Sequence, residues 1–325
     1  MELGERLDKR TAKIHPKFMP LSLLFQLIKI AKRKIDDLEA NILAYRSGGR
    51  GLVIDKPNIP IKVTPELDSI VIHLFADGAA GEFTPSYTQK NKETLDNFIR
   101  KLENCFGNFK KSIYFTQGKY QVKFPKAITD ILSKYYSIKS YNSYKSKIPE
   151  AILKRKESKF KLACIIAFIV DEGNIRDVIS LYSANKGLLN GIKNLTIDCN
   201  YICSKISFNK KSGNYSFTIS TYNLERFYQD IKGLSKEFPT CNLSFKEKEV
   251  VFILNRRKII NPKNRLFTEK KILNIIQREK ATAQQISKLT NYAYCTIIHN
   301  LKRLLNEGKL KRTKSSNKTY IWELA

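Results

Sequence analysis

The chain has 325 residues and carries 59 Lys and Arg against 30 Asp and Glu, a formal net charge of +29. A positive charge of this size favours a polyanionic partner, with nucleic acid first and an anionic membrane surface second. The apolar runs are much shorter than the roughly 20 residues that span a bilayer, and the charged N-terminus has no signal-peptide core. We therefore expect a cytoplasmic protein without a membrane partner.

The first sixty residues have the weakest pattern. Two helices are predicted, at 21–34 and 36–45, and a glycine-rich stretch follows at 47–51. The prolines at 57 and 60 favour an extended approach to the next helix. Segment 1–60 is expected to be an accessory helical arm that either contacts nucleic acid or packs on the rest of the chain.

Two apolar helices then end in an acid followed by glycine. The first begins at Thr64-Pro65, a good N-cap with proline at the first helical position, and ends at Asp77-Gly78. The second runs over 161–170 and reaches Glu172-Gly173. Glycine after each acid is typical of a left-handed helix cap.

The same succession of predicted elements follows both acids. A hairpin, at 81–90 and again at 174–183, leads to a helix that begins near Asn91 in the first copy and Asn185 in the second. Two alternating strands come next, at 112–116 with 120–124 and at 205–209 with 215–219. Each copy closes with a helix, at 126–136 and 222–232. A repeat this long is typical of a duplicated domain and not of a solenoid.

This pattern resembles the LAGLIDADG homing-endonuclease family over roughly residues 60–235. The matching segments are IVIHLFADG at 70–78 and IIAFIVDEG at 165–173. One such motif is a weak signal, whereas two motifs with the same following elements are a strong one. The resemblance implies an α+β fold in which two αββαββα halves form a pseudo-symmetric saddle. The motif helices would pack at its centre, and a sheet from each half would lie over DNA.

The motifs also depart from the family pattern. The third position is usually small, but it is Ile72 in the first copy and Ala167 in the second. The sixth position is usually acidic, but it is Phe75 and Val170. The last acidic position is retained in both copies.

The resemblance assigns catalysis to those last acids, Asp77 and Glu172. If the helices pair, both carboxylates reach the same end of the interface, where hard oxygen ligands with room for water suit Mg²⁺. Such a metal can activate water and stabilise the leaving oxygen of a phosphodiester. Each acid would serve one DNA strand. The alternative is a pair of solvated acids in a protein that has lost cleavage.

Neighbouring residues extend this expected site. The family places a lysine near the scissile phosphate, and Lys123 and Lys126, at the end of the last strand of the first half, fit that place. A solvated surface position is the alternative for Lys126. Asp171 lies one helical step away from the facing side, and we expect it on the solvated surface.

Alternation along the strands separates an apolar face from a polar one. The residues expected to face the core are Ile113, Phe115, Tyr120, Val122, Ile206, Phe208, Phe217 and Ile219. The polar face would contact base edges and phosphates, although a solvated face has the same pattern. The DNA contacts expected there are Ser112, Thr116, Gln121, Lys123, Arg176, Ser180, Lys205, Ser207, Asn209, Asn214, Ser216 and Thr218. The basic linker 139–161 would lie on phosphates or be solvated.

A second module begins after residue 260. Thr268 is expected to cap a helix at 269–278 and Thr282 a helix at 283–289, before a longer helix at 294–306 and strands at 309–312 and 319–324. This order resembles a winged helix-turn-helix, whose recognition helix enters a DNA groove. Such modules also bind proteins. The DNA contacts expected here are Tyr292, Tyr294, Thr296, His299, Asn300, Arg303, Lys311, Arg312, Lys314 and Lys318.

The cysteines and histidines narrow the chemistry further. The six cysteines are spread along the chain from Cys105 to Cys295, and the three histidines lie far apart in the sequence. Cys199 and Cys203 have the spacing of half a zinc site, but no second pair follows at finger spacing. Reduced, partly buried thiols are therefore expected, and a histidine-based nuclease or hydrolase triad is not.

Together these observations predict four segments, 1–60, 61–140, 141–260 and 261–325, in a monomer. The predicted function is Mg²⁺-dependent, site-specific cleavage of double-stranded DNA. A non-cleaving transcriptional regulator is the alternative, because bacterial sporulation regulators carry a degenerate LAGLIDADG domain ahead of a helix-turn-helix. A third reading is a maturase that binds intron RNA. The retained acids favour the nuclease, whereas the motif drift and the added module favour the regulator.

Overall fold

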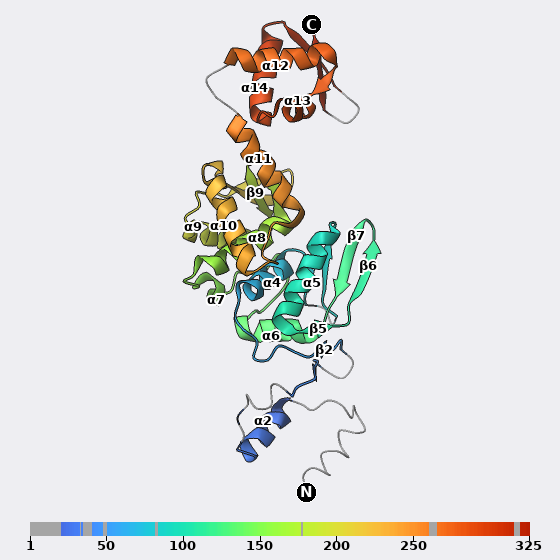
Figure 1. Cartoon of the computed structure of the whole chain (residues 1–325), viewed down its shortest axis with the longest axis vertical. Coiled ribbons are helices and arrows are strands. Elements are labelled where there is room, and N and C mark those ends of the chain that lie inside the picture. The colour runs from blue at the N-terminus through green and yellow to red at the C-terminus, as the bar shows by residue number, and fades with distance from the viewer. Residues whose placement is uncertain are drawn as a thin grey trace. The chain divides into compact units, whose positions relative to one another are not determined.

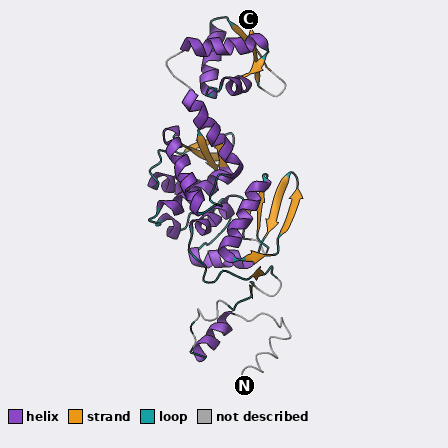
Figure 2. Cartoon of the chain, viewed as in Figure 1, coloured by secondary structure: helices purple, strands orange, loops and turns teal. Residues whose placement is uncertain are grey.

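The computed structural model describes residues 21–32, 34, 41–47, 51–81, 84–176, 178–259, 265–314 and 319–325. The chain divides into two compact units, one formed by 1–174 with 180–245 and the other by 175–179 with 246–325. Both mix helices with antiparallel strands (Figure 1, Figure 2). Among the described residues, no helix is long and apolar enough to cross a membrane.

The N-terminal segment differs from its prediction. Helix α2 spans Leu21–Ile30, but the second predicted helix is wrong at its C-terminal end, because residues 44–45 form strand β1. Tyr45 pairs there with Ile54, so the backbone of this segment is satisfied in a sheet and not in a helix. Residues 36–40 lie outside the described part. Strands β1 (Ala44–Tyr45), β2 (Ile54–Asp55) and β5 (Asn108–Phe109) form one small sheet in the order β1-β2-β5.

Residues 65–237 contain the same order of elements twice. The first run is α4 (Pro65–Ala76), β3 (Gly78–Ala79), β4 (Ser86–Gln89), α5 (Lys92–Phe106), β6 (Ser112–Thr116), β7 (Lys119–Lys123) and α6 (Lys126–Tyr136). After the short α7 (Glu150–Leu153), the second run is α8 (Ser158–Glu172), β8 (Gly173–Ile175), β9 (Ile179–Ser183), α9 (Lys186–Asp198), β10 (Ser207–Asn209), β11 (Asn214–Ile219) and α10 (Leu224–Glu237). The two four-stranded sheets, β3-β4-β7-β6 and β8-β9-β11-β10, have equivalent strand orders.

The helix starts follow local capping chemistry. The Thr64 hydroxyl accepts a hydrogen bond from the Leu67 amide at 3.3 Å, with Pro65 in the first helical position of α4. Asn91 and Asn185 cap α5 and α9 in the same way. A side chain that satisfies an otherwise unpaired amide fixes where a helix begins, which is why these starts could be predicted.

Helices α4 and α8 pack against each other and are buried on nearly every side. A helix that is apolar all round belongs in a core. The left-handed caps predicted at Gly78 and Gly173 are wrong, because neither residue has a positive φ. Glycine is needed there for space: a Cβ on Gly78 would lie 2.7 Å from the Leu74 Cα, and one on Gly173 would lie 2.5 Å from the Ile169 carbonyl oxygen.

The outer strands are more exposed than their alternation predicts. Phe115 pairs with Tyr120 and Ile113 with Val122, so these four residues share one face of the sheet, as predicted. Val122 is buried, but Ile113 and Phe115 are 44% and 62% exposed. Helix α5 packs against β4 and β7, whereas β6 is the edge strand. In the second sheet Phe217 and Ile219 are buried and Phe208, on the edge strand β10, is 51% exposed. Alternation therefore predicts which side chains share one face of the sheet, but it does not predict whether that face is buried.

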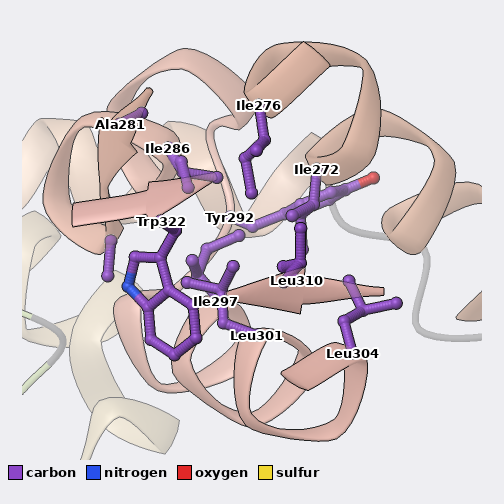
Figure 3. Packing of buried hydrophobic residues seen from close by; sticks show 11 residues of the cluster. Ile272, Ile276, Ala281, Ile286, Tyr292, Ile297, Leu301, Leu304, Leu310 and Trp322 are labelled. Atoms are coloured by element: carbon purple, nitrogen blue, oxygen red, sulfur yellow. The ribbon is translucent and has the colours of Figure 1, made fainter. Parts of the chain in front are cut away.

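The smaller unit combines helices with a three-stranded sheet. Its elements are α11 (Glu247–Ile259), α12 (Arg265–Arg278), β12 (Ala281–Thr282), α13 (Ala283–Thr290), α14 (Tyr294–Asn306), β13 (Leu310–Lys314) and β14 (Tyr320–Leu324), with the sheet order β12-β14-β13. Figure 3 shows Trp322 and Tyr292 among the isoleucines and leucines of its core.

Two details of this unit differ from the prediction. Thr268 lies inside α12, because that helix begins at Arg265, so its predicted capping role is wrong. Thr282 does cap α13, through a reciprocal capping box with Gln285. The short strand β12 was not predicted, because its pairing with Ile321 and Trp322 joins distant parts of the sequence.

Candidate active site

A buried hydrogen-bonded chain crosses from α5 through α4 to α8. The Lys101 Nζ lies 2.9 Å from the His73 Nε2, and the His73 Nδ1 lies 2.8 Å from the Asp171 Oδ2. An ammonium donates and cannot accept, so Nε2 accepts and Nδ1 donates its proton to Asp171. Burial, followed by the nearby Lys101, lowers the pKa of His73 well below its usual value. The imidazole is therefore neutral, with its proton on Nδ1.

A second layer of this network reaches the acid of the first motif. The Tyr87 hydroxyl donates to the Asp171 Oδ1 at 2.6 Å. The Gln89 Nε2 donates to the Asp77 Oδ2 at 2.6 Å and lies 3.0 Å from both the Asp171 Oδ1 and the Tyr87 oxygen. One side-chain amide thus bridges carboxylates from the ends of α4 and α8. Burial and the charge of Asp171 raise the pKa of Tyr87 well above its usual value, so its phenol remains a donor.

This arrangement overturns the expectation for Asp171. Its side chain is wholly buried and not on the solvated surface. The predicted helical step is real, but it turns the carboxylate toward His73 and Tyr87 instead of toward water. Buried charges in proteins are usually paired and hydrogen-bonded. The side chains that contact the Asp171 carboxylate, those of His73, Tyr87 and Gln89, all belong to the first half of the repeat.

The three predicted catalytic residues lie near these helix ends. Asp77 is the C-cap of α4 and Glu172 is the last residue of α8, and both are partly exposed. Lys126, at the start of α6, lines a pocket of about 510 Å³ together with 78–81, the segment directly after Asp77. Its Nζ lies 3.4 Å from the Asp130 carboxylate. Glu172 lines a separate pocket of about 200 Å³.

The donor set limits which metal could bind. Among the described residues, no group of three or more His, Cys, Asp or Glu is placed to hold an ion. An all-protein metal cage therefore does not fit. Mg²⁺ that is bound through one or two carboxylates, with water and phosphate as its other ligands, fits the chemistry of Asp77 and Glu172.

Most of the predicted DNA contacts of the two repeated runs lie on the polar faces of the two sheets. Lys123 pairs with both Ser112 and Ser86, and Ser207 pairs with Ser216, so these residues share faces across the strands. Thr116, Gln121, Asn209, Asn214 and Thr218 follow by alternation, and Ser180 points away from its buried neighbours Ile179 and Leu181. Lys205 is exposed just before β10, and Arg176 is exposed just after β8.

The predicted contacts of the smaller unit are only partly available. Tyr294, His299, Lys311, Arg312 and Lys314 are exposed and Thr296 is partly exposed. The predicted exposure of Tyr292 and Asn300 is wrong. Both are buried, Tyr292 in the core and Asn300 on the same face of α14 as Ile297 and Leu304, where it donates to the Thr296 carbonyl at 2.8 Å. Arg303 is held by ion pairs with Glu269 and Glu307. Lys318 lies outside the described residues.

The sequence reasoning missed four members of the network: His73, Tyr87, Gln89 and Lys101. A histidine within an otherwise apolar motif was the available signal for the first of them. Its partner Asp171 is 98 positions away, and Lys101 is buried on the amphipathic α5. A buried polar group needs a hydrogen-bond partner, so a partner for His73 could be expected. The sequence does not indicate which residue it is, because the partner is distant in the sequence.

No protein family and no curated protein matches the chain. Among solved structures, it is similar to I-DmoI in complex with DNA and Mn, with 15% identity, coverage of 51% of this chain and 96% of that one, and a TM-score of 0.39. It is also similar to full-length DUF199/WhiA from Thermatoga maritima, with 11% identity, coverage of 77% and 93%, and a TM-score of 0.39. The N-terminal LAGLIDADG domain of DUF199/WhiA has 11% identity, coverage of 54% and 86%, and a TM-score of 0.36. At such low identities and TM-scores, these similarities assign neither a fold nor a function.

Proposed function

We propose that the protein is a monomeric, metal-dependent endonuclease of the LAGLIDADG homing type, which cuts double-stranded DNA at a specific site. Its two αββαββα halves would form the saddle, and its C-terminal unit would be a winged helix. The observation that carries this proposal is the Gln89 amide that bridges Asp77 and Asp171 at 2.6 and 3.0 Å. This bridge supports a meeting of the two motif ends at one place, as paired catalytic acids require.

Within this proposal, Asp77 and Glu172 would hold a divalent cation, such as Mg²⁺, at the scissile phosphates. When bound, such a cation activates water and stabilises the leaving oxygen. A carboxylate at a helix C-terminus is disfavoured by about 0.3–1 kcal/mol, a cost that a cation offsets. Gln89 would hold Asp77 in one orientation through Oδ2. Lys126, on the pocket beside Gly78, would place its ammonium near a phosphate oxygen.

The remaining residues would supply binding. The polar faces of the two sheets would read base edges, because hydroxyls, amides and amines on a strand face match groove donors and acceptors. The exposed Lys311, Arg312 and Lys314 on β13 would contact phosphates. Such contacts set affinity and register without reading sequence.

A non-cleaving DNA-binding regulator is the second candidate. It is favoured by the departures of the motifs at Ile72, Phe75 and Val170, because a protein that only binds DNA does not need an intact catalytic motif. Cleavage itself separates the two candidates.

The test begins with a duplex selected by binding from a randomised or genomic library. The wild-type protein is expected to cut both strands with Mg²⁺ or Mn²⁺. Asp77→Asn and Glu172→Gln should each reduce double-strand cutting by more than about 100-fold, because loss of a ligand exceeds the effect of losing a supporting residue. Binding should persist, and one strand should still be nicked.

The matched controls are substitutions of exposed acids in the same unit, Asp96→Asn and Glu150→Gln. These variants should cut the selected duplex as fast as the wild type. Tight binding without any cutting by the wild type would favour the regulator. Cutting that survives both catalytic substitutions would show that these acids are not the site.

A further inference from the structure

We propose that Asp171 of the second motif is a positioning residue for Asp77 of the first motif, acting through the amide of Gln89. This inference rests on the proposed endonuclease function for its catalytic consequence. Its structural part concerns the orientation of one side-chain amide and stands without cleavage. Asp171 itself would touch neither DNA nor metal.

Asp171 is one of three acceptors that together fix the orientation of the Gln89 amide. The amide nitrogen of Gln89 points at two carboxylate oxygens, from Asp77 and Asp171, and at the oxygen of Tyr87. The opposite orientation would turn the amide oxygen toward two carboxylates, which only accept hydrogen bonds when ionised. The observed orientation is therefore the only one that pairs these groups.

Tyr87 adds a second contact to Gln89 that depends on Asp171. Its hydroxyl proton is committed to the Asp171 Oδ1 at 2.6 Å, which leaves its oxygen as an acceptor for Gln89. Without the Asp171 carboxylate, that proton is no longer committed, and the Gln89 amide loses the acceptor on Asp171 and the fixed acceptor on Tyr87. The amide would then be held by Asp77 alone, so the Asp77 carboxylate would be oriented less firmly.

The surroundings also explain how a buried carboxylate is retained. Removing an ion from water is costly unless hydrogen bonds and an opposite charge compensate it. His73 donates to Asp171 at 2.8 Å, and the ammonium of Lys101 lies 2.9 Å behind the imidazole. The side chains of His73 and Asp171 are 4% and 0% exposed, so this compensation takes place out of water.

In the described part of the second half, the positions equivalent to Tyr87 and Gln89 hold residues of different chemistry. Alignment of the helix caps Asn91 and Asn185 places Ser183 where the first half has Gln89 and Leu181 where it has Tyr87. Leucine can neither donate nor accept. Asp171 therefore lies next to Glu172 in the sequence but serves the acid of the other half, so its loss should affect one DNA strand.

Strand-resolved cleavage tests the catalytic part. The strand served by Asp77 is the one that Asp77→Asn leaves uncut. Asp171→Asn should slow cutting of that strand by about 10–100-fold, the range for a supporting residue around a metal site, while the strand served by Glu172 is cut at close to the wild-type rate. Gln89→Leu should have the same effect. The double variant should be no slower than the slower single variant, because both changes remove one interaction.

Metal-free NMR tests the structural part in the full-length protein. Selective ¹⁵N labelling of glutamine amides, with the Gln89 signal assigned by its loss in Gln89→Leu, reports the environment of that NH₂ group. Its protons should be protected from exchange in the wild type and should shift and exchange faster in Asp171→Asn. Thermal melting and DNA affinity of each variant confirm that it is folded.

The outcomes distinguish failure of the proposed function from failure of the Asp171–Gln89 contact. If the wild type never cuts DNA but the Gln89 amide responds to Asp171→Asn, the positioning contact stands and the proposed function fails. An unchanged amide signal would overturn the inference, and so would equal slowing of both strands, the result expected from local disturbance of Glu172. If Asp171→Asn does not fold, Tyr87→Phe is the second variant. It leaves the Asp171 charge but removes the hydroxyl, and the Gln89 signal should again change.

Discussion

At the scale of single residues, burial separates the cysteines into inert and reactive thiols. All six are free, and Cys295 is exposed, whereas four are buried and Cys203 is partly buried. Burial raises the pKa of Cys105 to about 12 and the pKa values of Cys199, Cys203 and Cys241 to about 11. The pKa of Cys164 is also raised well above its usual value. The sequence predicted reduced, partly buried thiols; in the structure four of the six are buried.

Only one thiol should therefore react quickly in the native protein. The thiolate is the reactive form, so a raised pKa removes it at pH 8. With a chromogenic disulfide reagent, the native chain should show one fast thiol and the chain in guanidinium should show six. Cys295→Ser should abolish the fast phase. Two or more fast thiols in the wild type would contradict this assignment.

At the scale of elements, a buried ion pair fastens the linker between the two runs to helix α4. Asp68, in the first turn of α4, is fully buried and accepts from the Arg155 Nε at 2.8 Å and Nη2 at 3.0 Å, and from the Tyr136 hydroxyl of α6. The basic linker was expected to lie on phosphates or in water. For Arg155 neither holds, because its guanidinium is committed to Asp68.

Substitution of Asp68 should lower the folding stability, because it removes the ion pair with Arg155. Asp68→Ala leaves the guanidinium without its carboxylate, and breaking a buried pair from one side costs about 3 kcal/mol or more of folding stability. Arg155 is 21% exposed, so the lower end of that range is expected. Tyr136→Phe, which removes one hydrogen bond to a charged carboxylate, should cost about 1.5 kcal/mol, the lower end for such bonds. Urea denaturation measures both, and similar losses for the two variants would contradict a dominant role of the ion pair.

The same scale shows what the sequence could and could not predict. Helix α14 and the caps Thr64, Asn91 and Asn185 could be predicted because their signals are local. The exposure of Phe115 could not be predicted, because it depends on which strands α5 packs against. Of the site, the acids Asp77 and Glu172 came from the motif resemblance. Their supporting residues Tyr87, Gln89 and Lys101 did not, because each partner lies on a separate element.

At the scale of the whole molecule, the net charge of +29 should govern DNA binding. Lysines and arginines release counterions from phosphates, so the logarithm of the binding constant should fall linearly with that of salt. We expect a loss of about 10³-fold between 50 and 200 mM salt, the lower end for a protein with 6–10 phosphate contacts. Fluorescence anisotropy with the selected duplex measures this. A binding constant that hardly changes would exclude nucleic acid as the partner.

Changes on β13 should alter that slope. Each lost phosphate contact lowers it by about 0.9, so the double change Lys311→Gln with Lys314→Gln should lower it by about twice that value. Lys92→Gln is the matched control, because Lys92 pairs with Asp96 on α5. An unchanged slope in the β13 variant would assign the C-terminal unit to a protein partner.

The pairing of His73 with Asp171 also determines which halves can associate. It joins the fourth position of one motif to the seventh of the other, and the reciprocal positions, Phe168 and Ala76, line one pocket together. Two copies of the first half would bury each imidazole opposite an alanine. Two copies of the second would set each carboxylate against a phenyl ring. Each half is therefore complementary to the other and mismatched to itself, so neither could be exchanged for a duplicate of its neighbour, and a gene split between them would have to express both pieces.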